Sequence, residues 1–195
     1  REGGSAPAYS ADGNRIFFTE GGQGGVRLMS SDINGQEEVT HLTASDVTEW
    51  AVSPDGEWIA FVEGWRTFIA PFPKSGRPVA ISKDSRSYPV AQASRWAGAY
   101  LHWSGDGSQL HWSQGPTYYT RQLAETFSFV QGGSEPPAEP EAEGVPIGFR
   151  AVADVPSGIV AFVGGRIITA SVDPSAHGAV DGVIEDGVVV VTGNR

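Results

Sequence analysis

Residues Ser53–Phe61 read SPDGEWIAF, and two looser copies of this stretch stand elsewhere in the chain, as SADGNRIFF at Ser10–Phe18 and SGDGSQLHW at Ser104–Trp112. Successive copies begin 43 and 51 residues apart. A sequence that resembles itself every 40–50 residues or so is typical of β-propeller blades or of a comparable array of repeated sheets. The repeat therefore predicts a chain built from similar β-sheets.

Each copy of the stretch predicts a hairpin. Proline fixes φ, aspartate accepts hydrogen bonds from nearby amides and glycine tolerates positive φ, so Ser-Pro-Asp-Gly favours a tight turn. The strands that follow, at 16–18, 59–61 and 110–112, carry apolar residues on both parities, whereas a half-buried strand would alternate. Sheets stacked face to face, as in a propeller, bury both of their faces and explain this pattern.

Further short strands are predicted after each hairpin, which gives about three units of four strands. They are expected at 26–32 and 37–42 in the first unit, at 67–72 and 78–81 in the second, and at 118–123 and 126–130 in the third. No stretch has a convincing helical period. The predicted fold class is all-β, a partial β-propeller followed by strands of a small β-sandwich.

The stretch Ser53–Phe61 and its copies resemble the TolB-type propeller repeat, a WD40-like repeat also called PD40. The resemblance implies propeller blades over residues 1–131, with repeats at 7–48, 49–98 and 99–131. The third copy departs from the family pattern, because Gly105 stands in place of proline and two histidines flank the turn.

Composition narrows the classes of partner. The chain has 195 residues and a formal net charge of −10, which argues against nucleic acid and anionic membrane surfaces. The absence of cysteine excludes disulfides and thiol catalysis. Because no apolar run reaches 18 residues, no membrane insertion is expected. Six tryptophans fall between Trp50 and Trp112, where we expect them to fill the space between blades.

The number of units is small for a propeller. Three units are found and the first begins close to Arg1, whereas closed propellers have about four to eight blades. We therefore expect a piece of a longer protein that lacks blades on its N-terminal side, or an assembly in which several copies close the ring. The expected partners are the remaining blades, another copy of the chain, and a protein or peptide ligand.

A change of composition follows the third unit. Residues 132–146 are acidic and rich in proline and glycine, and they predict an extended linker because they contain few large apolar groups. The acidic residues there are Glu135, Glu139, Glu141 and Glu143. Residues 147–195 lack the Ser-x-Asp-Gly phrase and are predicted to form a different domain. Short strands are expected in it, with turns at Gly164-Gly165 and Asp186-Gly187.

Two stretches of this last segment, Val160–Thr169 and Val183–Val190, resemble the opening of the amidohydrolase superfamily, in which a small β-sandwich precedes a metal-binding barrel. The resemblance implies a parent protein, secreted or periplasmic, that hydrolyses amide-type C–N bonds with water activated by a divalent, zinc-like metal. The family's His-x-His metal pair would follow the sandwich strands and is absent from this sequence. We therefore expect a non-catalytic segment with no catalytic, cofactor or metal residues of its own.

The residues themselves offer few catalytic candidates. No two of the four histidines have zinc-site spacing, but His102 and His111 flank one hairpin and could face each other, either as a metal or acid–base pair or as hydrogen-bonded partners between blades. His41 and His177 are expected to face solvent. There is no Gly-x-Ser-x-Gly elbow. The glycine-rich stretch 21–25 joins two strands, so it predicts a hairpin loop rather than a phosphate cradle.

Two further roles are expected to be structural. Asp12, Asp55 and Asp106 recur because the turn requires them. Arg166 is expected to pack or to pair with Glu185 or Asp186.

Two rivals to the hydrolase segment remain open. The chain could be a binding module that recruits a protein or peptide through propeller loops, with no enzyme attached, or part of a propeller-containing serine peptidase, against which residues 147–195 argue. The residues encoded after position 195 separate the three. A His-x-His supports the hydrolase, a stop codon the binding module, and a Gly-x-Ser-x-Gly the peptidase.

A fan of three blades leaves apolar blade faces and unpaired strand edges in water, which promotes self-association. We therefore predict dimers or larger species by light scattering. A monodisperse monomer would contradict this prediction.

Overall fold

The structure is a computed structural model, and it describes residues 4–22, 24–141, 143–154, 157–171, 173, 175, 177 and 179–193. The chain divides into two compact units, residues 1–148 and 149–195. Strands dominate both, and the four-residue α1 (Leu123–Thr126) is the one α-helix among the described residues. No helix in these ranges is long and apolar enough to cross a membrane.

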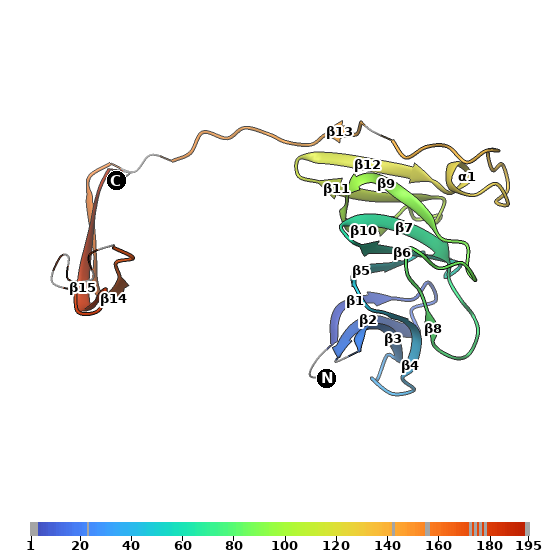
Figure 1. The fold of residues 1–195 in the computed structure, drawn as a ribbon, viewed down its shortest axis with the longest axis horizontal. Coiled ribbons are helices and arrows are strands. Elements are labelled where there is room, and N and C mark those ends of the chain that lie inside the picture. The colour runs from blue at the N-terminus through green and yellow to red at the C-terminus, as the bar shows by residue number, and fades with distance from the viewer. Residues whose placement is uncertain are drawn as a thin grey trace. The chain divides into compact units, whose positions relative to one another are not determined.

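Unit 1 contains three sheets, stacked in chain order (Figure 1). The first sheet has the order β1-β2-β3-β4-β8, with bounds β1 Gly4–Tyr9, β2 Arg15–Gly22, β3 Gly25–Asp32, β4 Val39–Ala44 and β8 Val79–Ala80. The second is β5-β6-β7-β9, with bounds β5 Val47–Val52, β6 Trp58–Glu63, β7 Arg66–Pro71 and β9 Ala91–Ala97. The third is β10-β11-β12-β13, with bounds β10 Ala99–Trp103, β11 Gln109–Gln114, β12 Thr117–Gln122 and β13 Val145–Pro146. Unit 1 is thus a partial β-propeller, as the repeat predicts.

The second sheet packs on both neighbours. Side chains alternate along a strand, so one face of β6 carries Ile59 and Phe61 and the other carries Ala60 and Val62. Ile59 and Phe61 belong to the core shared with the first sheet, together with Phe17, Leu28 and Leu42. Ala60 and Val62 belong to the core shared with the third sheet, together with Leu101, Leu110 and Trp112. The prediction that the strand after the turn is buried on both faces is confirmed for β6, whereas β11 is buried only on the face of Leu110 and Trp112.

The three Ser-x-Asp-Gly turns have one geometry. In the second copy, the Ser53 hydroxyl donates to the Asp55 carboxylate and accepts the Trp58 N–H at 2.9 Å. Ser10 and Ser104 make the same pair of contacts in their turns. Hydrogen bonds from the serine hydroxyls, joined by backbone amides, lower the pKa of Asp12 and of Asp106 to about 2. The expected structural role of these aspartates is confirmed.

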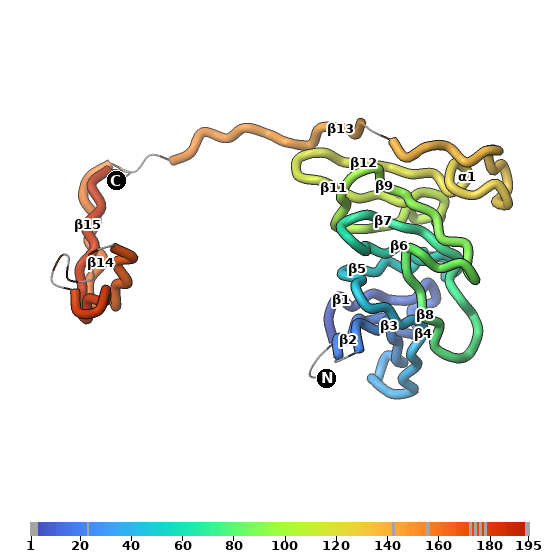
Figure 2. The backbone as a smooth tube through the Cα atoms, viewed as in Figure 1, coloured from blue at the N-terminus to red at the C-terminus, as the bar shows by residue number. Residues whose placement is uncertain are grey.

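The fourth strand of the second sheet differs from the prediction. The strand expected at 78–81 is β8, which pairs in parallel with β4 and so extends the first sheet. The fourth strand of the second sheet is β9, which pairs with β7. The connection from Phe72 to Val90 therefore leaves the second sheet, runs along the first and returns, as the green tube in Figure 2 shows. Sequence periodicity carries no information on this exchange because the pairing is between different repeats.

The end of the third sheet also differs. The strand expected at 126–130 is wrong, because α1 ends at Thr126 and turns follow it. The predicted linker supplies the fourth strand, β13, which pairs with β12. Arg121 holds the intervening segment in place. Its guanidinium is almost fully buried and donates to the carbonyls of Glu125 and Glu139, at 3.0 and 2.9 Å, and to that of Ala138.

The described residues of unit 2 form one antiparallel pair of strands, β14 (Ile159–Ile168) and β15 (Val183–Thr192). The turns predicted at Gly164-Gly165 and Asp186-Gly187 are wrong, because both lie inside these strands where the register shifts at a bulge. Gly164 and Asp186 have φ of 72° and 51°. Positive φ is required in tight turns and also in some β-bulges, and here these residues form bulges. Many apolar side chains of the pair are exposed within the described residues, among them Ile159, Phe162, Val163 and Val190.

Gly98 connects β9 to β10, where the second and third sheets approach each other closely. A Cβ on Gly98 would lie 2.3 Å from Thr67 Oγ1 and 2.8 Å from Trp112 Cδ1, and both of these side chains are buried. We predict that Gly98→Ala lowers the free energy of unfolding in urea by about 1–3 kcal/mol, because the neighbours must shift. Gly105→Ala is the control, since its Cβ would meet nothing within 4 Å, and it should change stability by less than about 0.5 kcal/mol. Equal effects of the two changes would contradict the packing.

Candidate functional site

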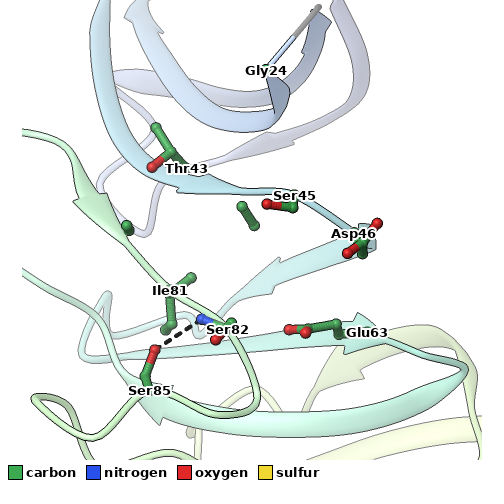
Figure 3. Close-up of a pocket in the computed structure, with 10 residues that line it drawn as sticks. Gly24, Thr43, Ser45, Asp46, Glu63, Ile81, Ser82 and Ser85 are labelled. Carbon is green, nitrogen blue, oxygen red and sulfur yellow. Dashed lines mark hydrogen bonds between the residues drawn. The ribbon is translucent and has the colours of Figure 1, made fainter.

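A cavity of about 420 Å³ lies between the first and second sheets, at the end where the β2–β3, β4–β5 and β6–β7 connections meet (Figure 3). We call it the inter-sheet pocket. Its lining residues are Gly24, Thr43, Ala44, Ser45, Asp46, Glu63, Ala80, Ile81, Ser82 and Ser85. Successive strands run in opposite directions, so these three connections fall at the same end of the two sheets.

The exchanged strand β8 forms one wall of the inter-sheet pocket. Ile81 follows β8, donates its N–H to the Thr43 carbonyl at 3.0 Å and buries its side chain. Ser82 then turns the segment, because its N–H donates to the Ser85 hydroxyl at 2.9 Å. The wall is therefore fixed by backbone pairing to β4.

Glu63 reaches the pocket because it is the last residue of β6. Alternation places it on the face of Phe61, which is directed toward the first sheet. Figure 3 shows its carboxylate pointing toward the Ile81–Ser85 segment. Glu63 is 9% exposed, and one carboxylate oxygen, Oε2, accepts the Lys83 N–H at 2.8 Å. No residue in the described part of the chain hydrogen-bonds to the other oxygen, Oε1.

The lining of the inter-sheet pocket is rich in acceptors. Its described residues include two carboxylates, Asp46 and Glu63, and no lysine, arginine or histidine. Four hydroxyls belong to Thr43, Ser45, Ser82 and Ser85. The neighbouring ammonium of Lys83 pairs with Asp84, and this hydrogen bond, with the charges of Asp84 and Glu63, raises the pKa of Lys83. The arrangement suits a ligand that donates hydrogen bonds.

An exposed tryptophan stands in the turn after Glu63. Gly64 and Trp65 connect β6 to β7 with φ of 55° and 72°, and Trp65 is 80% exposed. A bulky residue in this left-handed conformation costs free energy that glycine would not, and such strain is typical of functional sites. The expectation that the tryptophans fill the space between blades is wrong for Trp65 and for Trp96, which is 52% exposed.

A second cavity, of about 340 Å³, lies along the strands β1, β5 and β10. Its lining includes the aromatic rings of Tyr9, Trp50 and Trp103. Trp103 donates its indole N–H to the Ala51 carbonyl at 2.9 Å, whereas the buried indole nitrogen of Trp50 has no partner among the described residues. Its described lining includes His102 but no aspartate, glutamate, lysine or arginine.

His102 and His111 face each other, as the sequence suggests, with ring centroids 5.1 Å apart. They do not hydrogen-bond to each other. Nε2 of His102 lies 2.9 Å from the Tyr118 hydroxyl, and Nδ1 of His111 lies 2.9 Å from that of Thr120. Burial, and then the charge of His102, lower the pKa of His111. Because neighbours in β10 and β11 pack on the second sheet, the two histidines occupy the opposite face of the third sheet.

The structure corrects one histidine and agrees on another. His41 is not solvent-facing, because its half-buried ring lies 5.4 Å from both Phe17 and Phe72 and its Nε2 is 2.7 Å from the Ser30 hydroxyl. Burial, and then the charge of Arg15, lower the pKa of His41. His177 is exposed, as expected.

The remaining candidates are structural. Arg166 pairs with Glu185 at 3.1 Å, one of the two partners expected. The loop at 21–25 joins β2 to β3, although Gln23 lies outside the described residues. Within the described ranges, no three His, Cys, Asp or Glu side chains gather as a metal site would require.

Sequence reasoning missed Asp46, Glu63 and Trp65. The sequence carried a signal for Glu63 and another for Trp65. Glu63 is a carboxylate at the end of the run Ile59–Val62, which is buried on both faces, and Trp65 follows a glycine in a two-residue turn that favours small residues. Asp46 lies beside Glu63 because the β5–β6 hairpin pairs Val47 with Glu63, but the pocket wall after β8 could not be foreseen.

The chain is similar to solved structures at low sequence identity. No protein-family model matches the chain, and no curated protein matches it significantly. The β-propeller domain of the Trilobed protease from Pyrococcus furiosus is similar at 14% identity and TM-score 0.39, covering 63% of this chain and 44% of that one. TolB from Acinetobacter baumannii is similar at 12% identity and TM-score 0.35, covering 64% and 42%. Acylaminoacyl peptidase from Pyrococcus horikoshii is similar at 14% identity and TM-score 0.34, covering 56% and 16%.

The chain thus matches less than half the length of each of these structures. At this distance the likenesses say nothing about ligand or activity.

Because Trp65 has a strained positive φ, its replacement by glycine is predicted to stabilise the protein. We expect Trp65→Gly to raise the free energy of unfolding by up to about 1 kcal/mol, because glycine adopts positive φ without strain. Trp96→Gly is the matched control. It also removes an exposed tryptophan but places glycine inside β9, so it should lower stability by about 0.5–1 kcal/mol. Urea denaturation measures both, and a loss of stability in Trp65→Gly would contradict the strain.

Proposed function

We propose that unit 1 is a non-catalytic binding module whose ligand is a segment of a protein or peptide, held at the end of the first and second sheets that carries the inter-sheet pocket. One observation carries the proposal. Trp65, exposed and strained, directly follows the turn residue next to Glu63, a buried carboxylate that lines the pocket. Neither side chain belongs to the hydrophobic cores of unit 1, and stability does not explain a strained, exposed ring at Trp65.

A peptide fits these features better than a compact metabolite does. An exposed indole offers a flat apolar contact, and a hollow with scattered acceptors offers a site for one side chain. A peptide can reach both because its side chains extend from a backbone several residues long. Tryptophan is enriched at the energetic centres of protein interfaces, where it buries a large area at low entropic cost.

For the whole protein we propose the hydrolase parent suggested by the resemblance of Val160–Thr169 and Val183–Val190. It would hydrolyse amide-type C–N bonds with water activated by a divalent metal, in a secreted or periplasmic setting. This chain contains no His-x-His pair, so residues elsewhere in the parent would supply that pair of metal ligands. The residues encoded after position 195 test the proposal, and a stop codon there would remove it while leaving the binding module in place.

Selection from a random peptide library displayed on phage tests the binding module. We predict that the full chain enriches a set of peptides and that Trp65→Gly weakens their binding at least tenfold, although it folds at least as stably. Ile33→Ala is the control, because Ile33 is an exposed apolar residue in the β3–β4 turn, at the opposite end of the first sheet. Failure to enrich any peptide, or equal loss in the two variants, would overturn the proposal.

A further inference from the structure

We infer that the inter-sheet pocket receives a lysine or arginine side chain of the bound peptide, with Glu63 and Asp46 as its charge partners. This inference rests on the proposed function and names the chemistry of its ligand. It starts from a buried carboxylate with one oxygen free of partners in the described residues. Oε1 is not among the enclosed side-chain atoms that lack a partner, so a donor entering the pocket can reach it and pair the charge of this largely buried carboxylate.

Among the described residues, no lysine or arginine hydrogen-bonds to Oε1. Arg66 and Lys83 line a separate hollow of about 380 Å³ that also contacts Glu63, and neither lines the inter-sheet pocket. The Lys83 ammonium is paired with Asp84. The charge of Glu63 acts on Lys83 from that separate hollow, but no described lysine or arginine lines the inter-sheet pocket, so a cationic ligand can approach Asp46 and Glu63 there.

The shape and the lining of the pocket fit a long basic side chain. Lysine and arginine pack their methylene stems on apolar surface while the charged head finds acceptors. Ala44, Ala80 and Ile81 offer such a surface, and the hydroxyls of Ser82 and Ser85 lie on the same segment as that wall. A guanidinium carries five N–H donors, which matches a lining of two carboxylates and four hydroxyls.

A lone metal ion fits the same lining less well. A divalent cation such as Ca²⁺ takes about 6–8 oxygen ligands at 2.3–2.6 Å. The described residues hold no group of three carboxylate or imidazole side chains close enough for this. A volume of about 420 Å³ falls in the range of pockets for organic ligands, so an ion would leave most of it to water.

NMR titration of the full chain with acetyl-Gly-Arg-Gly-amide tests the inference. We expect shifts confined to the backbone amides of the inter-sheet pocket, and at least tenfold weaker binding of the same peptide with citrulline, which keeps the shape of arginine and removes its charge. Glu63→Gln should also weaken binding of the arginine peptide at least tenfold. Glu57→Gln is the matched control. Glu57 lies in the β5–β6 turn, at the opposite end of the second sheet, and its carboxylate pairs with Lys74. Glu57→Gln should therefore leave binding of the arginine peptide unaltered.

The outcomes separate this inference from the proposed function. Equal binding of the arginine and citrulline peptides, or shifts in the pocket with CaCl₂ and none with the arginine peptide, would overturn the inference. Phage selection gives an independent reading, because the enriched peptides should carry lysine or arginine and the Glu63→Gln variant should lose that preference. Enriched peptides without basic residues would refute the basic side chain and leave the binding module standing, whereas no enrichment at all would refute the binding module.

Discussion

The second sheet must bury both of its faces, and the rest of unit 1 follows from this constraint. Its strand β6 sends Phe61 into one core and Ala60 and Val62 into the other, so a sheet is needed on each side. Burial of a large apolar side chain such as Phe61 or Val62 contributes roughly 1.5–3 kcal/mol, so packing on both faces is a major source of stability. Polar contacts between neighbouring sheets add to this packing. Glu49, for example, accepts the N–H groups of Tyr100 and Leu101.

The same alternation that fills the cores creates the candidate site. β6 ends at Glu63, which lies on the same face as Phe61. The pocket wall beside Glu63 is formed by the segment after β8, which belongs to the second repeat but pairs with β4 of the first sheet. Because sheets pack through their central residues, their ends are free to carry residues that the hydrophobic cores do not use. Asp46, Glu63 and Trp65 all lie at such an end. The packing thus positions a charged hollow and an exposed ring without using either in its core.

Local features were predictable from the sequence and exchanged features were not. The Ser-x-Asp-Gly turns, the strands after them and the Arg166–Glu185 pair depend on residues close in sequence or in one hairpin. The positions of β8, β9 and β13 depend on pairing between distant segments, which no short pattern encodes. Gly164 and Asp186 show a further limit, because positive φ serves a bulge as well as a turn. The β5–β6 hairpin brings Asp46 close to Glu63, because Val47 pairs with Glu63, but the wall that Ile81 and Ser82 form depends on β8, and the pocket was missed for that reason.

Hydrogen exchange of the Trp103 indole N–H tests the face-to-face packing most directly. This group donates to the Ala51 carbonyl across the boundary between the second and third sheets, at 2.9 Å. Stacked sheets predict slow exchange of this proton in native buffer, together with a nuclear Overhauser effect to Ala51, while the exposed indole of Trp65 exchanges fast. Exchange at Trp103 as fast as at Trp65 would contradict the stacking of the sheets.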